Sequence, residues 1–311
     1  MTEKKNKYLY GPVPSRRLGR SLGVDVIPLK TCTLNCIYCQ LGRTPKTTTE
    51  RKDYLPIAEI LSELQQRLAK GLDADYITIG GSGEPTLHSR LGELIDGIRK
   101  ITAIPVAILT NGTLLYRPDV RADCAKADVV APSLDVGDEQ AFGTINRPHP
   151  DITIDKLIDG LCRFRDEYPG RIWLEVFLIE GFNTDTDQIA KLKSAIERIR
   201  PDKVHLNTAV RPTAEAGVEK VSREKLIRIA EQLGPQCEVI ADFVSAHCGL
   251  TPGDLAQTVL SMLKRRPCSL GDISSGLGIH RNEVSRCISQ LQKQGSVCSE
   301  EKGGIIFYKV R

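Results

Sequence analysis

Apolar residues recur at helical spacing in several stretches of the first 240 residues. Within residues 55–69 the apolar positions on one face are Ile57, Ile60, Leu61, Leu64 and Leu68. The same spacing returns in residues 154–164, 189–199 and 226–233. A helix with 3.6 residues per turn places such positions on a single buried stripe, so each stretch is predicted to be an amphipathic helix.

Short runs rich in valine and isoleucine alternate with these helical stretches. They begin near Gly23, Tyr76, Val106, Val129, Trp173 and Val204. Repeated strand-then-helix units predict an α/β fold with parallel strands and helices outside the sheet. Functional residues of such folds gather at the carboxyl ends of the strands, and polar residues follow these runs.

The alternation of predicted strands and helices ends near residue 250. This change predicts two domains, 1–245 and 253–311. The second part is expected to form a helix, a short helix, a tight turn at Leu277-Gly278, a longer helix and a hairpin around Gly303-Gly304. The buried stripe of the longer helix would be Val284, Cys287, Ile288 and Leu291. Its outer face would carry Arg281, Ser285, Arg286, Ser289 and Lys293.

Charge is concentrated in this second part of the chain. Residues 253–311 hold nine Lys and Arg against five Asp and Glu, whereas the first 252 residues are neutral. A basic helix face suits a nucleic-acid reader, because Lys and Arg contacts to phosphates supply most non-specific affinity. Protein docking and dimerisation remain alternatives for the same face.

The 311 residues are enough for one large domain and one small one. No run of eighteen apolar residues occurs, and residues 1–7 lack the apolar core of a signal peptide. The chain is therefore expected to be cytoplasmic, without a membrane partner. Its ten cysteines are then expected to be thiols or ligands.

Three of these cysteines, Cys32, Cys36 and Cys39, form a C-x3-C-x2-C triplet in TCTLNCIYCQLG. Three thiolates on a short loop can hold three irons of a [4Fe-4S] cluster and leave the fourth iron open. A zinc site would need a fourth ligand, and His88 is the only nearby candidate. The other cysteines have no C-x2-C spacing, although an auxiliary cluster from Cys237, Cys248 and His247 remains an alternative.

The triplet, with Tyr38 before its last cysteine, resembles the cluster loop of radical S-adenosylmethionine (SAM) enzymes. Later segments match that superfamily in order: YITIGGSGEPTL (76–87), VAILTNGT (106–113), VVAPSLDV (129–136), WLEVFLIEGFN (173–183) and VHLNTAVRP (204–212). The resemblance covers about residues 8–240 and implies a partial (β/α)6 barrel. Residues 253–311 resemble a winged helix-turn-helix domain.

Within the superfamily, GPVPSRRLGRSLGVDVIP and LNTAVRP look most like the wyosine-synthase-like branch. The wyosine synthases carry extra N-terminal cysteines for an auxiliary cluster, and no cysteine precedes Cys32 here. That departure puts their particular reaction in doubt.

The resemblance implies a [4Fe-4S] cluster, SAM and an external electron donor such as flavodoxin or ferredoxin. The residues expected to bind the cofactors, besides the three cysteines, are Tyr38, Gly81, Gly83, Glu84, Asn111, Ser133, Asp135, Arg147 and Asn207. The two glycines would let the backbone approach the methionine moiety, and Glu84 would pair with its ammonium group. A phosphate cradle is the alternative for GGSG, but the lysine of a P-loop is missing.

Asn111 and Asp135 are expected to contact the ribose, and Ser133 the ribose or the carboxylate. Further polar residues are expected at the ends of the fifth and sixth units, namely Glu175, Asn183, Asn207 and Arg211. Arg147 and Arg211 could clamp a carboxylate or phosphate, and Arg16 and Arg17 could meet an anionic substrate.

The sequence thus predicts a radical SAM enzyme that acts on a tRNA base gathered partly by its C-terminal domain. A peptide or protein substrate is the enzymatic alternative, and a DNA-binding regulator that senses its cluster and SAM is another. Because every cluster and SAM motif precedes residue 212, the C-terminal domain is expected to be dispensable for SAM cleavage itself.

Overall fold

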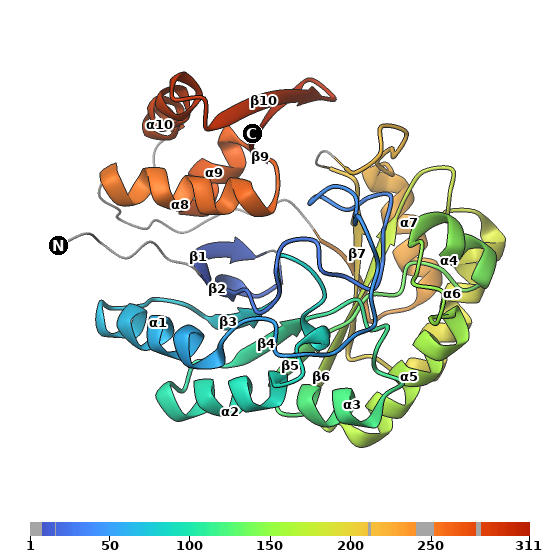
Figure 1. Cartoon of the computed structure of the whole chain (residues 1–311). Coiled ribbons are helices and arrows are strands. Elements are labelled where there is room, and N and C mark those ends of the chain that lie inside the picture. Colours follow the sequence, from blue (N-terminus) through green and yellow to red (C-terminus); the bar gives the residue numbers. More distant parts are fainter. Residues whose placement is uncertain (1–7, 16, 211–212, 241–251, 278–280) are drawn as a thin grey trace.

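A long, mostly parallel sheet forms the frame of the computed structural model (Figure 1). The structure describes the whole chain except residues 1–7, 16, 211–212, 241–251 and 278–280. The strands of this sheet are β1 (Leu9–Ser15), β2 (Gly19–Val24), β3 (Tyr76–Ile79), β4 (Val106–Leu109), β5 (Val129–Ala131), β6 (Arg171–Leu178), β7 (Lys203–Thr208) and β8 (Cys237–Val239).

The strand order follows the chain from β1 to β8. β1 and β2 form an antiparallel hairpin, and every neighbouring pair from β2 to β8 is parallel. All six predicted strand units are present, and the sheet is the α/β partial barrel that the sequence predicts. β1 and β8 are additional strands at its two edges.

Helices connect the parallel strands and cover the outer face of the sheet (Figure 1). They are α1 (Ile57–Ala69), the short 3-10 helix η1 (Pro85–Leu87), α2 (Leu91–Ile101), α3 (Pro118–Cys124), α4 (Glu139–Ile145), α5 (Ile154–Glu167), α6 (Thr186–Ile199) and α7 (Arg223–Leu233). Several begin at a side chain that accepts a backbone N–H of the first turn, as Asp138, Thr153, Asp185 and Ser222 do.

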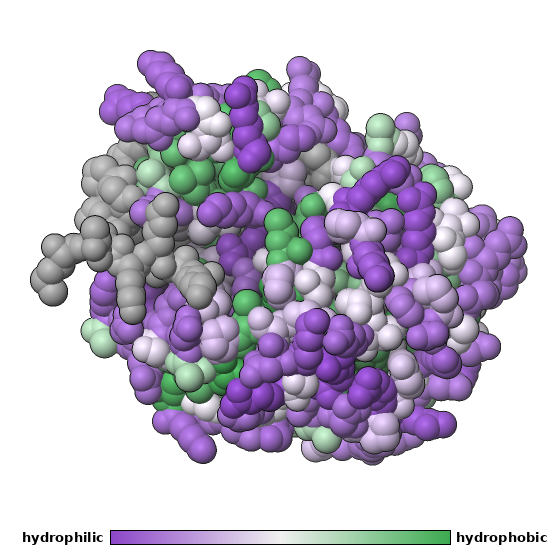
Figure 2. All heavy atoms as spheres, viewed as in Figure 1, coloured by the Kyte–Doolittle hydropathy of each residue, from purple (hydrophilic) through white to green (hydrophobic). Residues whose placement is uncertain are grey.

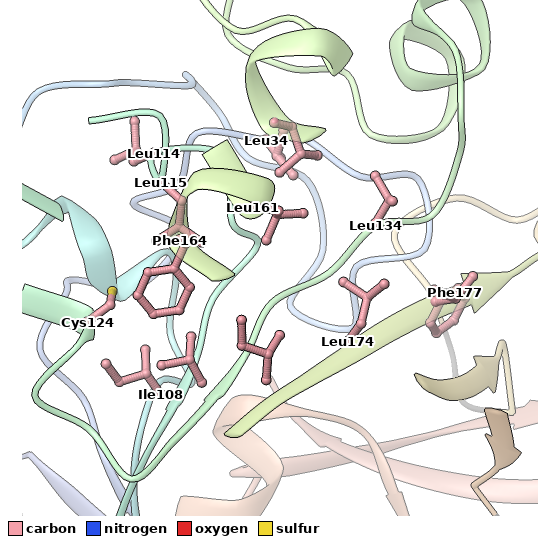
Figure 3. Packing of buried hydrophobic residues seen from close by; sticks show 14 of the residues in the cluster. Leu34, Ile108, Leu114, Leu115, Cys124, Leu134, Leu161, Phe164, Leu174 and Phe177 are labelled. Atoms are coloured by element: carbon pink, nitrogen blue, oxygen red, sulfur yellow. The ribbon is translucent and has the colours of Figure 1, made fainter. Parts of the chain in front are cut away.

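The main core lies between the sheet and these helices. Figure 3 shows Leu115, Cys124, Leu161 and Phe164 meeting in one buried cluster, and all four are fully or almost fully buried. The apolar stripe of α1 faces the same core through Ile57, Ile60 and Leu64. The helical periodicity of the sequence therefore identifies the buried faces.

The residues from Pro252 onward form a second, smaller unit with its own core. Its elements are α8 (Pro252–Arg265), β9 (Cys268–Ser269), α9 (Leu270–Leu277), α10 (Arg281–Lys293), β10 (Val297–Lys302) and β11 (Ile305–Val310). The three strands pair in the order β10, β11, β9, and Gly303 and Gly304 connect the hairpin.

The predicted stripe of α10 is correct, because Val284, Ile288 and Leu291 are buried and Cys287 is partly buried. The predicted turn at Leu277-Gly278 runs into residues 278–280, outside the described part of the chain.

The smaller unit packs on the edge hairpin of the large sheet. α8 and α9 contact β1, and Val13 of β1 packs against the core of the smaller unit. A second contact is made by Lys302, whose ammonium donates to the carbonyl of Val218. α8 lies between β1 and α10, so α10 faces away from the large sheet (Figure 1).

The surface of both units is largely hydrophilic in the view of Figure 2, with scattered apolar patches. Within the described residues, no helix has the length and apolar character needed to cross a membrane.

Candidate active site

The cysteine loop follows β2 and is held by backbone hydrogen bonds to the last residue of α4 and the residue that follows it. The N–H of Asn35 donates to the carbonyl of Asn146 at 3.0 Å, and the N–H of Ile37 donates to the carbonyl of Ile145 at 2.9 Å. The N–H of Cys39 bonds the carbonyl of Cys36 at 3.2 Å, which closes the turn between these two cysteines. These bonds tie the cysteine loop to the end of α4.

Each cysteine sulfur of the triplet accepts a hydrogen bond from a nitrogen donor. Lys30 Nζ lies 3.2 Å from Cys39 Sγ. Asn111 Nδ2 lies 3.6 Å from Cys32 Sγ, and Asn146 Nδ2 lies 3.6 Å from Cys36 Sγ. Burial raises the pKa of the Cys32 thiol to about 12 and that of Cys36 well above its usual value.

The GGSGEP segment after β3 packs against this loop backbone to backbone. The N–H of Lys30 donates to the carbonyl of Ser82 at 2.7 Å, and the N–H of Glu84 donates to the carbonyl of Thr31 at 2.9 Å. A Cβ on Gly83 would lie 2.0 Å from the Thr31 carbonyl oxygen, so only glycine fits there. Gly81, at φ +131°, has a conformation that also favours glycine.

Glu84 is buried, with 2% of its surface exposed, and it caps η1. Its Oε1 accepts hydrogen bonds from Thr86 and Thr110, and its Oε2 accepts the backbone N–H of Asn111 at 2.7 Å. Burial raises the pKa of this carboxyl. Most of the contacts fall on Oε1, so Oε2 keeps a lone pair for a further donor.

Asp135, after β5, joins the cysteine loop to the sheet. Its carboxylate accepts hydrogen bonds from the Tyr38 hydroxyl, from Asn146 Nδ2 at 2.7 Å and from the backbone N–H of Phe177 at 2.9 Å. Tyr38 also stacks on Phe177 with ring centroids 4.0 Å apart. Burial raises the pKa of Asp135 to about 6 despite these donors.

Three further polar residues lie together inside the barrel. Arg17 pairs with Glu175, and Asn207 Nδ2 donates to Glu175 Oε1 at 3.1 Å. The predicted position of Glu175 at a strand end is wrong, because it lies in the middle of β6. Its backbone bridges to Ser133, which is half-buried beyond β5. Asn183 is fully buried and bonds main-chain groups, which is a structural role.

Arg147 has a left-handed backbone, with φ 46°, and both of its terminal nitrogens reach Glu215. Arg43 pairs with the same carboxylate at 2.9 Å. The N–H of Glu215 donates to the carbonyl of Ile37, so the segment after β7 lies against the cysteine loop. The other two candidate arginines, Arg16 and Arg211, lie outside the described residues.

The alternative of a zinc site with His88 finds no support in the geometry. His88 is buried, its Nδ1 accepts the N–H of Arg90 and its Nε2 bonds the carbonyl of Leu55. In the described part of the chain, no three His, Cys, Asp or Glu side chains converge on a single metal ion. A [4Fe-4S] cluster does not need such convergence, because each thiolate binds a different iron.

The cysteines outside the triplet are free thiols where they are described. Cys124 and Cys268 are fully buried, and Cys162, Cys237, Cys287 and Cys298 are partly buried. Cys248 and His247, the candidates for an auxiliary cluster, fall in 241–251 and so outside the described residues.

A buried acceptor beside the cysteine loop supports the fit of a ligand there. Asn146 Oδ1 is buried without a hydrogen-bond partner among the described residues, while its Nδ2 binds Asp135 and Cys36. Leaving such an acceptor unpaired costs about 1–3 kcal/mol, which a donor from a bound molecule would recover. Three thiols with a short glycine-rich segment beside them fit a cluster with an adjoining amino-acid ligand.

Sequence reasoning missed four residues of this region: Tyr10, Asp25, Lys30 and Asn146. Lys30 is the only basic residue in 21–42, which is a signal that could have identified it. Asp25 accepts the N–H of Ser82 at 3.0 Å and pairs with Arg265 of α8. The Arg265 guanidinium lies 3.4 Å from the centre of the Tyr10 ring, and the Tyr10 hydroxyl donates to the Gly80 carbonyl.

The cysteine loop lies within a segment of the chain that matches a known protein family. The family model described as "Radical SAM superfamily" matches residues 26–192, more than half of the chain. A UPF0026 protein of Methanocaldococcus jannaschii is 37% identical over 222 residues, covering 71% of this chain and 69% of that protein. A protein named GTPase Obg of Brachyspira hyodysenteriae is 38% identical over 309 residues, which are 98% of this chain but 45% of that protein. The chain therefore spans less than half the length of this relative.

Solved structures show a similar fold at low sequence identity. A radical SAM methyltransferase from Sphaerobacter thermophilus has a TM-score of 0.53 and 20% identity, covering 70% of this chain and 66% of that one. Streptococcus suis SuiB bound to its precursor peptide SuiA has a TM-score of 0.53 and 17% identity, covering 70% of this chain and 48% of that one. These likenesses concern the fold alone.

Proposed function

We propose, because this chain belongs to the radical SAM superfamily, that Cys32, Cys36 and Cys39 hold its cluster and that the loops after β3, β4 and β5 bind SAM. The protein is a radical SAM enzyme, and its cofactors are a [4Fe-4S] cluster and SAM. When bound, the reduced cluster supplies the electron that cleaves SAM into methionine and a 5′-deoxyadenosyl radical.

One observation carries this proposal: the cysteine loop and the GGSGEP segment are joined by direct backbone hydrogen bonds. With a cluster bound to the three cysteines, this contact would bring its open iron near the strand end that we propose receives the amino-acid part of SAM. Glu84 Oε2 would accept the ammonium group of SAM, and Asn146 Oδ1 would accept a second donor from it.

The remaining polar residues would shape the rest of the pocket. Asn111, Ser133 and Asp135 follow β4 and β5, at the strand ends where the ribose is expected. Asp135 would act chiefly by holding Tyr38 and Asn146 in place. Arg17, Glu175 and Asn207 contact one another beside Ser133 and would face the substrate.

The proposed substrate is a tRNA base. We propose that the C-terminal unit acts as a winged helix-turn-helix domain and binds the tRNA. In this unit, α10 carries three exposed basic side chains, Arg281, Arg286 and Lys293. Among the described residues, these three make no ion pair, so their charges are available for phosphates. The resemblance to the wyosine-synthase-like branch favours RNA over a peptide. Flavodoxin or ferredoxin would supply the electron.

The test of the cluster proposal compares two triple variants after anaerobic reconstitution. Replacing Cys32, Cys36 and Cys39 by Ala should reduce iron and sulfide to background and abolish 5′-deoxyadenosine formation with a chemical reductant. The wild type should bind about four irons per chain.

The matched control replaces the partly buried Cys162, Cys237 and Cys298 by Ala and should keep the full iron content. Four irons retained in the first variant would overturn the assignment of the ligands. Iron lost from the control instead would point to an auxiliary cluster.

A further inference from the structure

Lys30 has an uncommon backbone conformation. It is one of three non-glycine residues with a positive φ among the described residues, at 64°. A lysine in the left-handed region costs free energy that the surrounding structure must offset. Here the backbone N–H of Lys30 binds Ser82, and its side chain turns back over the cysteine loop.

The ammonium group of Lys30 has two partners on that loop. It donates to Cys39 Sγ at 3.2 Å and to the carbonyl oxygen of Gly42. Lys30 forms no ion pair with a carboxylate in the described residues, so its positive charge is directed at the cysteine sulfur. It is half-buried, which limits screening of this charge by solvent.

The sulfurs of Cys32 and Cys36 accept from neutral donors, the side-chain amides of two asparagines. Asn111 and Asn146 each present one amide nitrogen at 3.6 Å, to Cys32 and Cys36. Both side chains are fixed by other bonds, to Thr33 for Asn111 and to Asp135 for Asn146. The three donors come from the residue preceding the loop, from the end of β4 and from the end of α4.

We propose that Lys30, Asn111 and Asn146 form a set of N–H donors, one to each of the three cysteine sulfurs that would bind the cluster, and that the charge of Lys30 raises the reduction potential of the cluster. This inference rests on the proposed ligands above. Reduction adds one negative charge to the cluster, and a fixed cation beside a ligand sulfur stabilises the reduced form more than the oxidised form. Hydrogen bonds and charge near the sulfurs are known determinants of such potentials. Lys30 is thus a positioning and tuning residue, and it touches no substrate.

The test measures the midpoint potential of Lys30→Met by redox titration followed by electron paramagnetic resonance. We expect the ratio of oxidised to reduced cluster at a fixed applied potential to rise about tenfold, a shift of about 59 mV to more negative values for a one-electron couple. Lys30→Arg keeps the positive charge, so its midpoint potential should be closer to that of the wild type than the potential of Lys30→Met is. The matched control is Lys46→Met, which removes an exposed lysine from the same region and should not shift the potential.

Iron content distinguishes a failure of the proposed cluster ligands from a failure of the proposed tuning role of Lys30. If the wild type binds no cluster, or its triple cysteine variant still does, the proposed ligands fail. If Lys30→Met retains its iron and its potential equals that of the wild type, the tuning role is overturned. Should Lys30→Met lose iron, the same titration on Lys30→Gln decides, because the neutral amide keeps a donor and removes only the charge.

Discussion

At the level of single residues, the site depends on polar groups that already have partners. The sequence predicts that Glu84 pairs with an ammonium group, yet in the structure it also accepts hydrogen bonds from Thr86, Thr110 and Asn111. These bonds favour the ionised carboxylate, although burial still raises the pKa of Glu84. The same residue therefore caps η1 and fixes the start of the loop after β4, and in the proposed site it would present one oxygen to SAM.

Glu84→Gln should weaken SAM binding by one to two decades, since a charge-assisted hydrogen bond contributes about 1.5–3 kcal/mol. Isothermal titration of the reconstituted variant measures this. Burial raises the pKa of Glu84, so the wild type should lose SAM affinity as the pH falls through that raised value, and the variant should lack this dependence.

The amide would also turn an N–H toward one of the present donors, so a lower unfolding temperature is expected as well. Glu231→Gln, at an exposed position of α7, is the control and should change neither quantity. Wild-type SAM affinity in Glu84→Gln would remove this carboxylate from the site.

At the level of elements, the cysteine loop after β2 packs against the GGSGEP segment after β3. Their contact is made by backbone atoms, and Gly83 is the position where side-chain atoms cannot fit. The strand–helix repeats bring these loops together, because β2 and β3 are parallel neighbours and both loops leave at the same edge. The sequence predicts that edge, but the pairing of Thr31 with Glu84 comes only from the structure.

Gly83→Ala should separate the two loops. A methyl group 2.0 Å from a backbone oxygen must displace one of them, and such overpacking costs about 1–3 kcal/mol. We expect lower iron content after reconstitution and a lower unfolding temperature. Gly143→Ala is the control, because a Cβ there meets open space within α4 and should stabilise the helix by about 0.5–1 kcal/mol. Full iron content and unaltered unfolding in Gly83→Ala would contradict the close packing.

Across the whole chain, the two units are coupled more closely than the sequence suggests. The order of motifs predicts that the C-terminal unit can be removed without effect on SAM cleavage. Arg265 of α8, however, pairs with Asp25, and Asp25 accepts the N–H of Ser82 in the GGSGEP segment. Deleting the unit would leave Asp25 without its cation and would expose Val13 of β1, so point substitutions are the better test of its role.

Reversing Arg281, Arg286 and Lys293 to Glu should weaken tRNA binding and lower the salt dependence of the affinity by about one in slope for each phosphate that is no longer neutralised. These exposed residues lie on α10, which α8 separates from the large sheet, so iron content and substrate-free SAM cleavage should persist. Binding of tRNA across a salt series measures the effect, and comparison of tRNA nucleosides from cells with each variant measures turnover.

The control reverses Lys100, Lys193 and Arg228, which are exposed on helices of the large unit. It has the same charge change and should leave the affinity nearly unaltered. If both variants bind tRNA like the wild type at low salt, the nucleic-acid proposal fails and a peptide or protein substrate takes its place. Binding of a specific DNA duplex, without SAM turnover, would instead support a sensor.

The amino-acid sequence alone establishes the strand and helix order, the buried faces and the family, because hydrophobic periodicity and local motifs depend only on residues that are close together in the sequence. It locates Cys32, Cys36 and Cys39 on one loop and Glu84 at a strand end. The folded chain was needed to show that Lys30, Asn111 and Asn146 meet the three sulfurs, that Glu175 lies inside the barrel with Arg17, and that Arg265 reaches Asp25. Such contacts join residues up to 240 positions apart, and each depends on strand register and domain packing that no local pattern encodes.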